Sequence, residues 1–281
     1  LVALTRTVKA DGLDLNYEGF AYADGTSSWA TTKPIWTRFV SELADALHAK
    51  SKLLFVTIPP VFAPTDGSGS GYWVYNPIGI VDSVDRIRFM AYDYSTSRVG
   101  PTAPLEWTQR IVEFAKANLP VGKVELGVPL YGRDWITGSS GACPAGVATS
   151  GRDSIRTSRA PSLAKSVGAR PTRQPNGEMM FTYTANVAGT ASSGSCTVNH
   201  TVWYPDSVST TGKLQQALNA GLAGISVFAL GYDEPGHFDP IRPIATALSH
   251  SPGVDPIGDW AITGTAPGSV RVAGWALDPE S

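Results

Sequence analysis

Short apolar runs alternate with segments of helical spacing along most of the chain, and this alternation constrains the fold more than any other feature. Apolar residues recur every three or four positions in residues 36–50 and 105–118, as on the buried face of a helix. A third helix is predicted over residues 213–220, with Gly221 as its C-cap. The apolar runs, which are the predicted strands, cover residues 12–18, 53–58, 87–92, 124–130 and 225–230. Because strands that alternate with helices pair in parallel, the sequence predicts an α/β protein with either an open doubly wound sheet or a closed barrel.

Polar and aromatic residues gather where these predicted strands end. Enzymes with a TIM (β/α)8 barrel build their active sites at the C-terminal ends of the strands, so this distribution favours the barrel. Such a barrel has eight strands, and the five predicted here are expected to be strands four to eight, with about three strand–helix units upstream of Leu1. The residues at the strand ends are Asn16, Glu18, Tyr92, Asp93, Tyr131, Arg133 and Phe228.

Residues 134–211 break the alternation. This stretch is rich in Gly, Ser and Thr, and parts of it alternate apolar with polar residues. It is predicted to be a small α+β insertion before the last strand of the barrel. The partial barrel is then expected to comprise residues 1–133 and 212–250.

The C-terminal part of the chain differs again. Pro252, Pro256 and Pro267 indicate a linker, and residues 269–277 alternate apolar and polar side chains like a strand. Residues 251–281 are therefore predicted to be a linker and the start of a further β module, through which the protein could associate with a cell wall.

The two cysteines, Cys143 and Cys196, both lie in the polar stretch of the predicted insertion. An exported protein would place a disulfide there to close a long loop, and no C-x-x-C pair or nearby histidine set indicates metal or redox chemistry. Two unrelated buried thiols are the alternative. The expected disulfide, together with few lysines, 29 glycines and 21 prolines, favours a secreted, extracellular protein.

Charge and hydropathy exclude several function classes. The net charge of −2 leaves no basic stripe of the kind that binds nucleic acid. The chain contains no apolar run long enough to span a membrane. A cluster of polar residues follows the last predicted strand, but its spacing matches no known ligand pattern, so loop polarity and capping explain it better than a metal site. The cluster consists of Asp233, Glu234, His237 and Asp239. Neither a metal nor a cofactor is expected.

The first predicted strand carries an unusual polar face. Its side chains alternate, so that Asp14, Asn16 and Glu18 share one face. Three polar side chains are costly inside a central parallel strand unless they bond to one another or to a ligand. The alternative is an edge strand with one face in water.

The segment from Asp11 to Glu18, DGLDLNYE, resembles the D-G-x-D-x-D-x-E motif of glycoside hydrolase family 18, with Asn16 as the only departure. MAYD at 90–93 is similar to that family's M-x-Y-D, and GVPLYGR at 127–133 is similar to its G-x-P-x-Y-G-R. Residues 224–231 resemble its eighth strand, so the resemblance covers about residues 1–250. It implies a (β/α)8 barrel that cleaves N-acetylated glycans.

The resemblance also implies residue roles. Glu18 would be the general acid, and the nucleophile would be the acetamido oxygen of the substrate, an exception among glycosidases. Tyr92 would hydrogen-bond that acetamido group, Asp93 would contact the sugar or Glu18, and Met90 would line the pocket floor. Asp11 and Gly12 complete the motif as structural residues.

Further sugar contacts follow from the same resemblance. Tyr131 and Arg133 would contact the sugar, and Phe228 stands where the family usually has a tryptophan under the ring, so its apolar face is smaller. Trp73 follows a Gly/Ser-rich stretch near the presumed active end of the barrel, and it is either a sugar contact or part of the core.

The asparagine in the motif leaves two functions open. An aspartate at position 16 would accept the acetamido N–H and offset the positive charge of the cyclic oxazolinium intermediate, whereas Asn16 can only accept the N–H. Losing such an electrostatic partner costs on the order of 10² to 10³ in rate, although Asp14 on the same face could take part of that role. The first hypothesis is a retaining, substrate-assisted glycosidase acting on β-1,4-linked N-acetylglucosamine polymers, either chitin or peptidoglycan. The alternative is a catalytically impaired, lectin-like barrel that binds N-acetylated polysaccharide.

Overall fold

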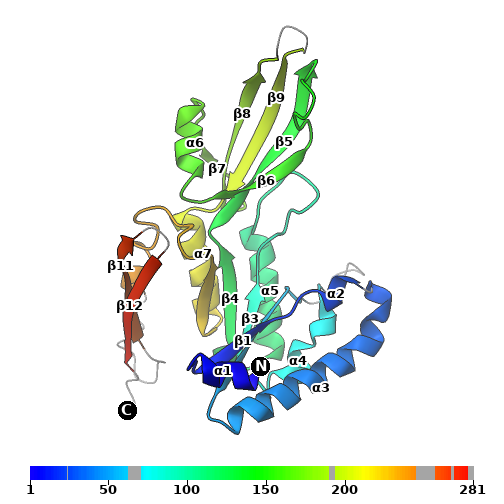
Figure 1. The fold of residues 1–281 in the computed structure, drawn as a ribbon, viewed down its shortest axis with the longest axis vertical. Coiled ribbons are helices and arrows are strands. Elements are labelled where there is room, and N and C mark those ends of the chain that lie inside the picture. The colour runs from blue at the N-terminus through cyan, green and yellow to red at the C-terminus, as the bar shows by residue number, and fades with distance from the viewer. Residues whose placement is uncertain (24, 63–70, 190–193, 245–256, 267–268, 278–281) are drawn as a thin grey trace. The chain divides into compact units, whose positions relative to one another are not determined.

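The computed structural model describes residues 1–23, 25–62, 71–189, 194–244, 257–266 and 269–277. The chain divides into two compact units, Leu1–Pro235 and Gly236–Ser281. The first unit contains a parallel sheet with its helices and an antiparallel insertion (Figure 1).

The parallel sheet has five strands in the order β1-β2-β3-β4-β10, and every neighbouring pair is parallel. The α/β prediction is therefore confirmed. Within the described residues the sheet is open, with β1 and β10 as its edges, so barrel closure stays a prediction. The strands are β1 (Gly12–Asn16), β2 (Leu53–Ile58), β3 (Arg86–Met90), β4 (Val124–Pro129) and β10 (Gly224–Phe228).

The edge position of β1 matches the alternative interpretation of its polar face. Asp14 and Asn16 are exposed on one side of β1, whereas Leu15 is buried in the core on the other. Glu18 lies two residues beyond the end of the strand, because β1 ends at Asn16. Exposure at the edge of the described sheet therefore accounts for Asp14 and Asn16, whereas Glu18 lies beyond the strand.

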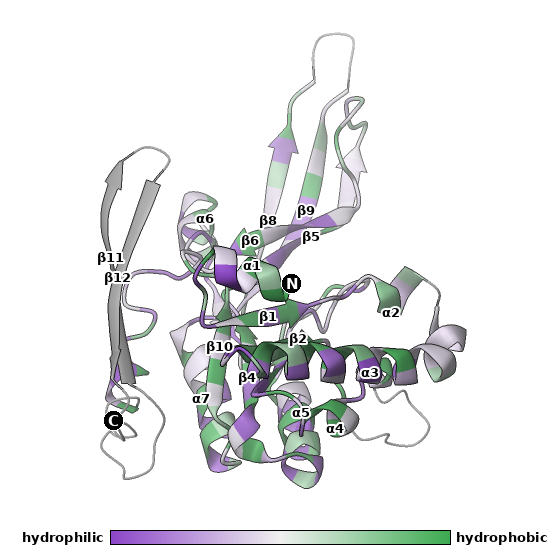
Figure 2. Ribbon diagram, turned by 60° about the horizontal axis from the view of Figure 1, so that its bottom comes forward, coloured by the Kyte–Doolittle hydropathy of each residue, from purple (hydrophilic) through white to green (hydrophobic). Residues whose placement is uncertain are grey.

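One face of the sheet packs against helices through alternate residues of each strand. Leu54, Val56 and Ile58 of β2 are fully buried in a core shared with α3 and α5. Figure 2 shows hydrophobic and hydrophilic residues alternating along α3. The opposite face carries the polar members of the strands, including Asp14 and Arg88. The helices of this unit are α1 (Val2–Thr7), α2 (Phe20–Ala23), α3 (Trp29–His48), α4 (Pro77–Ile80), α5 (Leu105–Asn118) and α7 (Ser207–Asn219), with α6 in the insertion.

Two helices begin earlier than their apolar spacing predicts. α3 starts at Trp29, whose buried ring lies two turns before Trp36 on the same face, and Pro34 inside the helix obscures this continuity in the sequence. α7 starts at Ser207 because the Asp206 side chain accepts the Ser209 N–H as an N-cap. Gly221 follows the end of α7 with φ +75°, as predicted for a C-terminal glycine.

The insertion is an antiparallel sheet in the order β6-β5-β9-β8-β7, with a small core formed by α6 and residues such as Phe181 and Val202. It starts at Tyr131, three residues before the predicted boundary, and its last strand ends at Tyr204. In the structure Cys143 and Cys196 form a disulfide, with the sulfur atoms 2.07 Å apart. Its elements are β5 (Tyr131–Gly141), β6 (Gly151–Arg156), α6 (Ala160–Ser166), β7 (Thr172–Arg173), β8 (Met179–Val187) and β9 (Cys196–Tyr204).

The second unit contains an antiparallel hairpin of β11 (Ile257–Ala266) and β12 (Ser269–Leu277). The predicted strand 269–277 matches β12, but residues 257–266 form a strand where the sequence indicated a linker. The predicted linker residues 251–256, and residues 245–250 of the predicted barrel, lie outside the described residues. In the described part of the chain, no helix is long and apolar enough to cross a membrane.

Candidate active site

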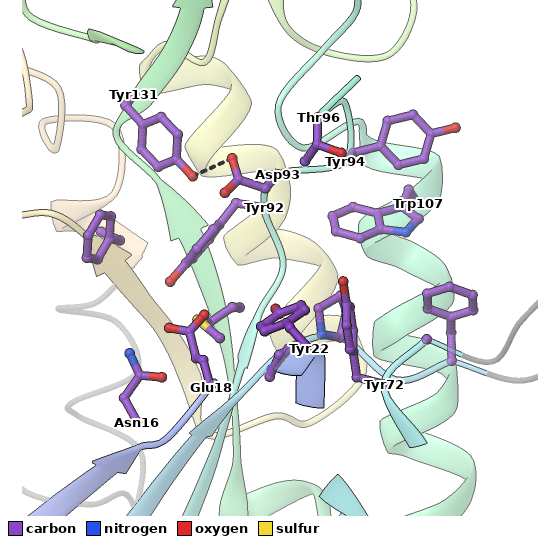
Figure 3. A pocket seen from close by; sticks show the side chains of 16 residues that line it. Asn16, Glu18, Tyr22, Tyr72, Tyr92, Asp93, Tyr94, Thr96, Trp107 and Tyr131 are labelled. Atoms are coloured by element: carbon purple, nitrogen blue, oxygen red, sulfur yellow. Dashed lines mark hydrogen bonds between the residues drawn. The ribbon is translucent and has the colours of Figure 1, made fainter. Parts of the chain in front are cut away.

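A cavity of about 540 Å³ lies at the C-terminal ends of β1, β2 and β3 (Figure 3). Seven predicted site residues line it, although they come from four separate segments of the sequence. The wall also contains aromatic residues that the sequence analysis did not select, namely Tyr22, Phe62, Tyr72, Tyr94 and Trp107. The predicted residues in the lining are Asn16, Glu18, Met90, Tyr92, Asp93, Tyr131 and Phe228.

Glu18 is held at the end of β1 by its backbone. The buried Tyr75 hydroxyl donates to the carbonyl oxygens of Tyr17, at 3.1 Å, and Glu18, at 3.3 Å. In Figure 3 the side chains of Glu18 and Tyr92 point toward one another. Burial raises the pKa of the Tyr92 phenol, and the neighbouring Glu18 carboxylate raises it further. Tyr92 therefore stays a protonated hydrogen-bond donor beside the carboxyl group.

Asp93 lies in the cavity wall in a left-handed backbone conformation, with φ +61°. Its Oδ1 accepts a hydrogen bond from the Tyr131 hydroxyl at 2.8 Å and a second from the Arg133 guanidinium. Burial, followed by the Asp93 charge, raises the pKa of Tyr131, so this phenol also remains a donor. The sequence predicted sugar contacts for both Tyr131 and Arg133. In the structure Tyr131 lines the cavity, whereas Arg133 is outside the lining and bonds Asp93.

Asp14 lines a smaller cavity together with Asn16, and its carboxylate is paired with other side chains. Thr57 Oγ1 donates to Asp14 Oδ1 at 2.8 Å, and Arg88 Nη1 donates to Asp14 Oδ2. Arg88 Nε also donates to Glu125 Oε2 at 2.7 Å. The Asp14 carboxylate is thus already paired with a cation beneath the cavity, which argues against the expectation that it supplies the charge missing at Asn16.

The floor of the cavity is aromatic. Phe228, at the end of β10, is stacked on Tyr92 with ring centroids 5.9 Å apart and an interplanar angle of 29°. Its side chain is half exposed, so one face remains available to a ligand. Met90, which is buried, also lines the cavity, as predicted for a floor residue.

Trp73 lies outside the lining of this cavity. Its ring contacts Trp29 at 5.3 Å between centroids, and the Lys33 ammonium lies 5.7 Å from its centroid. The preceding residue, Tyr72, lines the cavity instead. The sequence left open whether Trp73 contacts the sugar or belongs to the core, and in the structure its ring packs against Trp29 outside the lining.

Asp11 and Gly12 act through the backbone. The Leu53 N–H donates to the carbonyl oxygen of Asp11 at 3.0 Å, which continues the β1–β2 pairing. A Cβ at Gly12 would lie 2.5 Å from the Leu53 carbonyl oxygen. Glycine is therefore required for β1 to approach β2 so closely, and β1 carries Asn16 and leads to Glu18.

Within the described residues, no group of three or more His, Cys, Asp or Glu side chains is placed to hold a metal ion. Arg, Tyr and carboxyl groups dominate the cavity and its surroundings. This donor set suits a neutral, hydrogen-bonding ligand with an apolar face, such as a sugar ring.

Comparison with known proteins agrees with the fold and the motifs. The family model for glycosyl hydrolases family 18 matches residues 1–233. The uncharacterized glycosylase YvbX of Bacillus subtilis is 24% identical over 246 residues, which are 86% of this chain and 63% of YvbX. A cortical fragment-lytic enzyme of the same organism is 24% identical over 203 residues, which are 71% of this chain and 43% of that enzyme.

The chain thus spans less than two thirds of the length of either relative. Among solved structures, the chitinase of Chromobacterium violaceum superposes with a TM-score of 0.68 at 23% identity, over 86% of this chain and 68% of that one. The fold is therefore the α/β fold of chitinases. With the family model covering its parallel sheet, its insertion and its cavity, the chain belongs to glycosyl hydrolase family 18.

Proposed function

We propose that this chain is the catalytic part of a glycosidase that hydrolyses β-1,4-linked, N-acetylglucosamine-containing glycan with retention of configuration. The observation that carries the proposal is the convergence of Glu18, Tyr92 and Asp93 on one cavity with an aromatic floor. Membership of family 18 supports the reaction class. The polymer is chitin or peptidoglycan.

The proposed reaction proceeds in two steps. Glu18 donates a proton to the glycosidic oxygen, the bond between that oxygen and C1 breaks, and the acetamido oxygen of the same sugar bonds to C1. The resulting oxazolinium ring is opened by water, whose proton returns to the Glu18 carboxylate. Tyr92 donates a hydrogen bond to the acetamido group, and the Asn16 side-chain oxygen accepts its N–H.

Electrostatics set the expected rate. Asn16 carries no charge to offset the oxazolinium cation, and the Asp14 carboxylate beneath it is paired with Arg88. Besides Glu18, Asp93 is the nearby carboxylate in the cavity wall. Its Oδ1 already accepts hydrogen bonds from Tyr131 and Arg133, which reduce the charge that it presents to a ligand. Turnover is therefore expected to be slow compared with a site that has aspartate at position 16.

We propose further that the five parallel strands are strands four to eight of a closed (β/α)8 barrel. Parallel sheets are usually covered on both faces. The face that carries Asp14, Arg88 and Ser226 is partly exposed in the described residues, which supports additional strands across it.

The Cys143–Cys196 disulfide supports a secreted protein, because disulfides persist in oxidising compartments. We propose that the β11–β12 hairpin begins a module that associates with a cell wall.

The absence of charge at Asn16, together with the pairing of Asp14, also supports a second candidate: a glycan-binding barrel without turnover. The discriminating experiment uses the full-length protein and N-acetylglucosamine hexamer, with products detected by mass spectrometry. We expect cleavage in the wild type, complete loss in Glu18→Gln and faster cleavage in Asn16→Asp. Binding of the hexamer without cleavage by any of these variants would replace the glycosidase with the glycan-binding function.

A further inference from the structure

A buried carboxylate in the insertion contacts the segment that leads from the cavity to α5. Glu178, in the turn between β7 and β8, is completely buried. Its two carboxylate oxygens accept the backbone N–H groups of Thr102, at 2.9 Å, and Ala103, at 2.6 Å. The carbonyl oxygen of Asn176, in the same turn, accepts the Leu105 N–H at 2.9 Å. The insertion therefore supplies the acceptors at the start of α5.

The carboxylate faces a buried cation. Lys213 of α7 is also completely buried. Burial raises the pKa of Glu178 above its ordinary value, and the Lys213 charge and the two backbone N–H groups offset part of that rise. A buried charge is tolerated when an opposite charge and hydrogen bonds surround it. Both conditions are met at Glu178.

A chain of hydrogen bonds connects this carboxylate to the cavity. Thr102, whose N–H donates to Glu178, accepts the Tyr94 N–H on its own carbonyl oxygen at 2.9 Å. Tyr94 follows Asp93 directly, and both line the cavity. The Tyr94–Thr102 hydrogen bond thus joins the two arms of the loop 91–104. Glu178 bonds the arm that contains Thr102.

We propose that Glu178 is a positioning residue of the active site, holding the loop 91–104 in the conformation that places Asp93 and Tyr94 in the cavity. Thr102 and Ala103 are fully buried, so their N–H groups need an acceptor. Without the carboxylate, two buried donors lose their partner, and the loop must rearrange to satisfy them. The catalytic consequence rests on the proposed glycosidase function, whereas the effect on the loop does not.

The test measures amide hydrogen exchange of the loop in the full-length protein. In Glu178→Gln we expect the amides of Tyr94, Thr102 and Ala103 to exchange about ten- to a hundredfold faster, since one acceptor oxygen is replaced by an NH₂ group. Amides in β2 and β4 should keep their wild-type rates. In a wild type that cleaves N-acetylglucosamine hexamer, kcat should fall about tenfold or more while KM changes less, because Asp93 is misplaced.

Asp206→Asn is the matched control. Asp206 caps α7 and pairs with Arg173 near the same turn, but its hydrogen-bond partners, Arg173 and Ser209, lie outside the loop 91–104. This variant should lower the melting temperature and leave the exchange of Tyr94 and Thr102 unchanged. Equal acceleration of these amides in both variants would reduce Glu178 to a general stabilising residue and overturn the proposal.

A second variant covers the case in which Glu178→Gln fails to fold. Glu178→Gln combined with Lys213→Met removes both buried charges but leaves the loop with one carboxamide oxygen in place of two carboxylate oxygens. Loop exchange that stays at the wild-type rate in this folded double variant contradicts the proposal. If the wild type cleaves nothing while the loop amides respond as expected, the glycosidase function fails and the positioning role stands.

Discussion

One arginine–carboxylate cluster lies within the parallel sheet and another joins the end of β3 to β5 of the insertion, and they differ in what their carboxylates face. In the lower cluster, Arg88 bonds both Asp14 and Glu125, and the acidic groups are turned toward the cation and Thr57. In the upper cluster, Arg133 and Tyr131 bond one oxygen of Asp93, which still lines the cavity. The first arrangement neutralises charge beneath the site, and the second aims a carboxylate into it. Similar ion pairs at different places in the fold can therefore serve different purposes.

The largest expected effect comes from adding a charge above the lower cluster. Asn16→Asp should raise kcat by about 10²-fold, because a carboxylate at this position offsets the oxazolinium charge while Arg88 keeps Asp14 neutralised. Initial rates on N-acetylglucosamine hexamer, with Asn16→Leu as the control of similar size, measure the gain. A rate for Asn16→Asp no higher than that of the wild type would mean that the site lacks more than this one charge.

Removing the upper arginine should impair catalysis more than folding. Arg133→Met leaves the Asp93 carboxylate held by Tyr131 alone, so we expect kcat to fall about tenfold or more through loss of orientation. The melting temperature should fall only modestly, because the Arg133 side chain is 14% exposed but its partner Asp93 is 40% exposed, so that water weakens the ion pair. Rescue by Arg133→Lys should be incomplete, since an ammonium group cannot reproduce the fork geometry of a guanidinium.

Removing the lower arginine, Arg88, should impair folding more than catalysis. Arg88→Met leaves Asp14 without its cation and Glu125 paired with Arg86 alone, and we expect a loss of about 1–3 kcal/mol in the free energy of unfolding. Urea unfolding measures this loss. Arg88→Met with Glu125→Leu should recover part of it. If Arg88→Met leaves stability intact and instead abolishes cleavage, the assignment of the two clusters is reversed.

The smallest effect is a pH dependence of stability from the upper cluster. The pKa of Tyr131 is raised in the folded state, so its contribution is fully present below the ordinary tyrosine pKa and is lost as pH rises above it. At a pH half a unit above that ordinary value, the wild type should lose about 0.8 kcal/mol more than Tyr131→Phe. Urea midpoints of both proteins across pH 9–11, an interval of about one unit either side of the tyrosine pKa, measure the difference. Identical profiles would show that the Tyr131 phenol titrates normally.

Much of the parallel sheet could be predicted from the sequence, because buried strands and amphipathic helices leave a periodic apolar pattern. β2 and α5 agree with their predicted ranges at both ends. The start of α7 was missed because its first five residues, 207–211, are polar except for the exposed Val208, and only the Asp206 cap marks it. The strand at 257–266 was missed because prolines on both sides of it indicated a linker.

Site residues that belong to a family motif could be predicted from the sequence. Ion pairs between residues on different strands could not. Glu18, Tyr92 and Asp93 follow strand ends and carry family motifs, and they line the cavity as expected. The pairing of Asp14 with Arg88 joins residues 74 positions apart, and periodicity contains no information about it. Tyr22 lies on the four-residue helix α2, which is too short to produce a periodic signal.

The bonds from Glu178 to Thr102 and Ala103 also restrict how such proteins can be recombined. If the insertion of this chain were transplanted onto another family 18 protein, its Glu178 carboxylate would meet a loop and a helix of different sequence. Chimeras should therefore exchange the insertion together with the loop 91–104 and α7, and a library that cuts between these segments would be enriched in folded but inactive members.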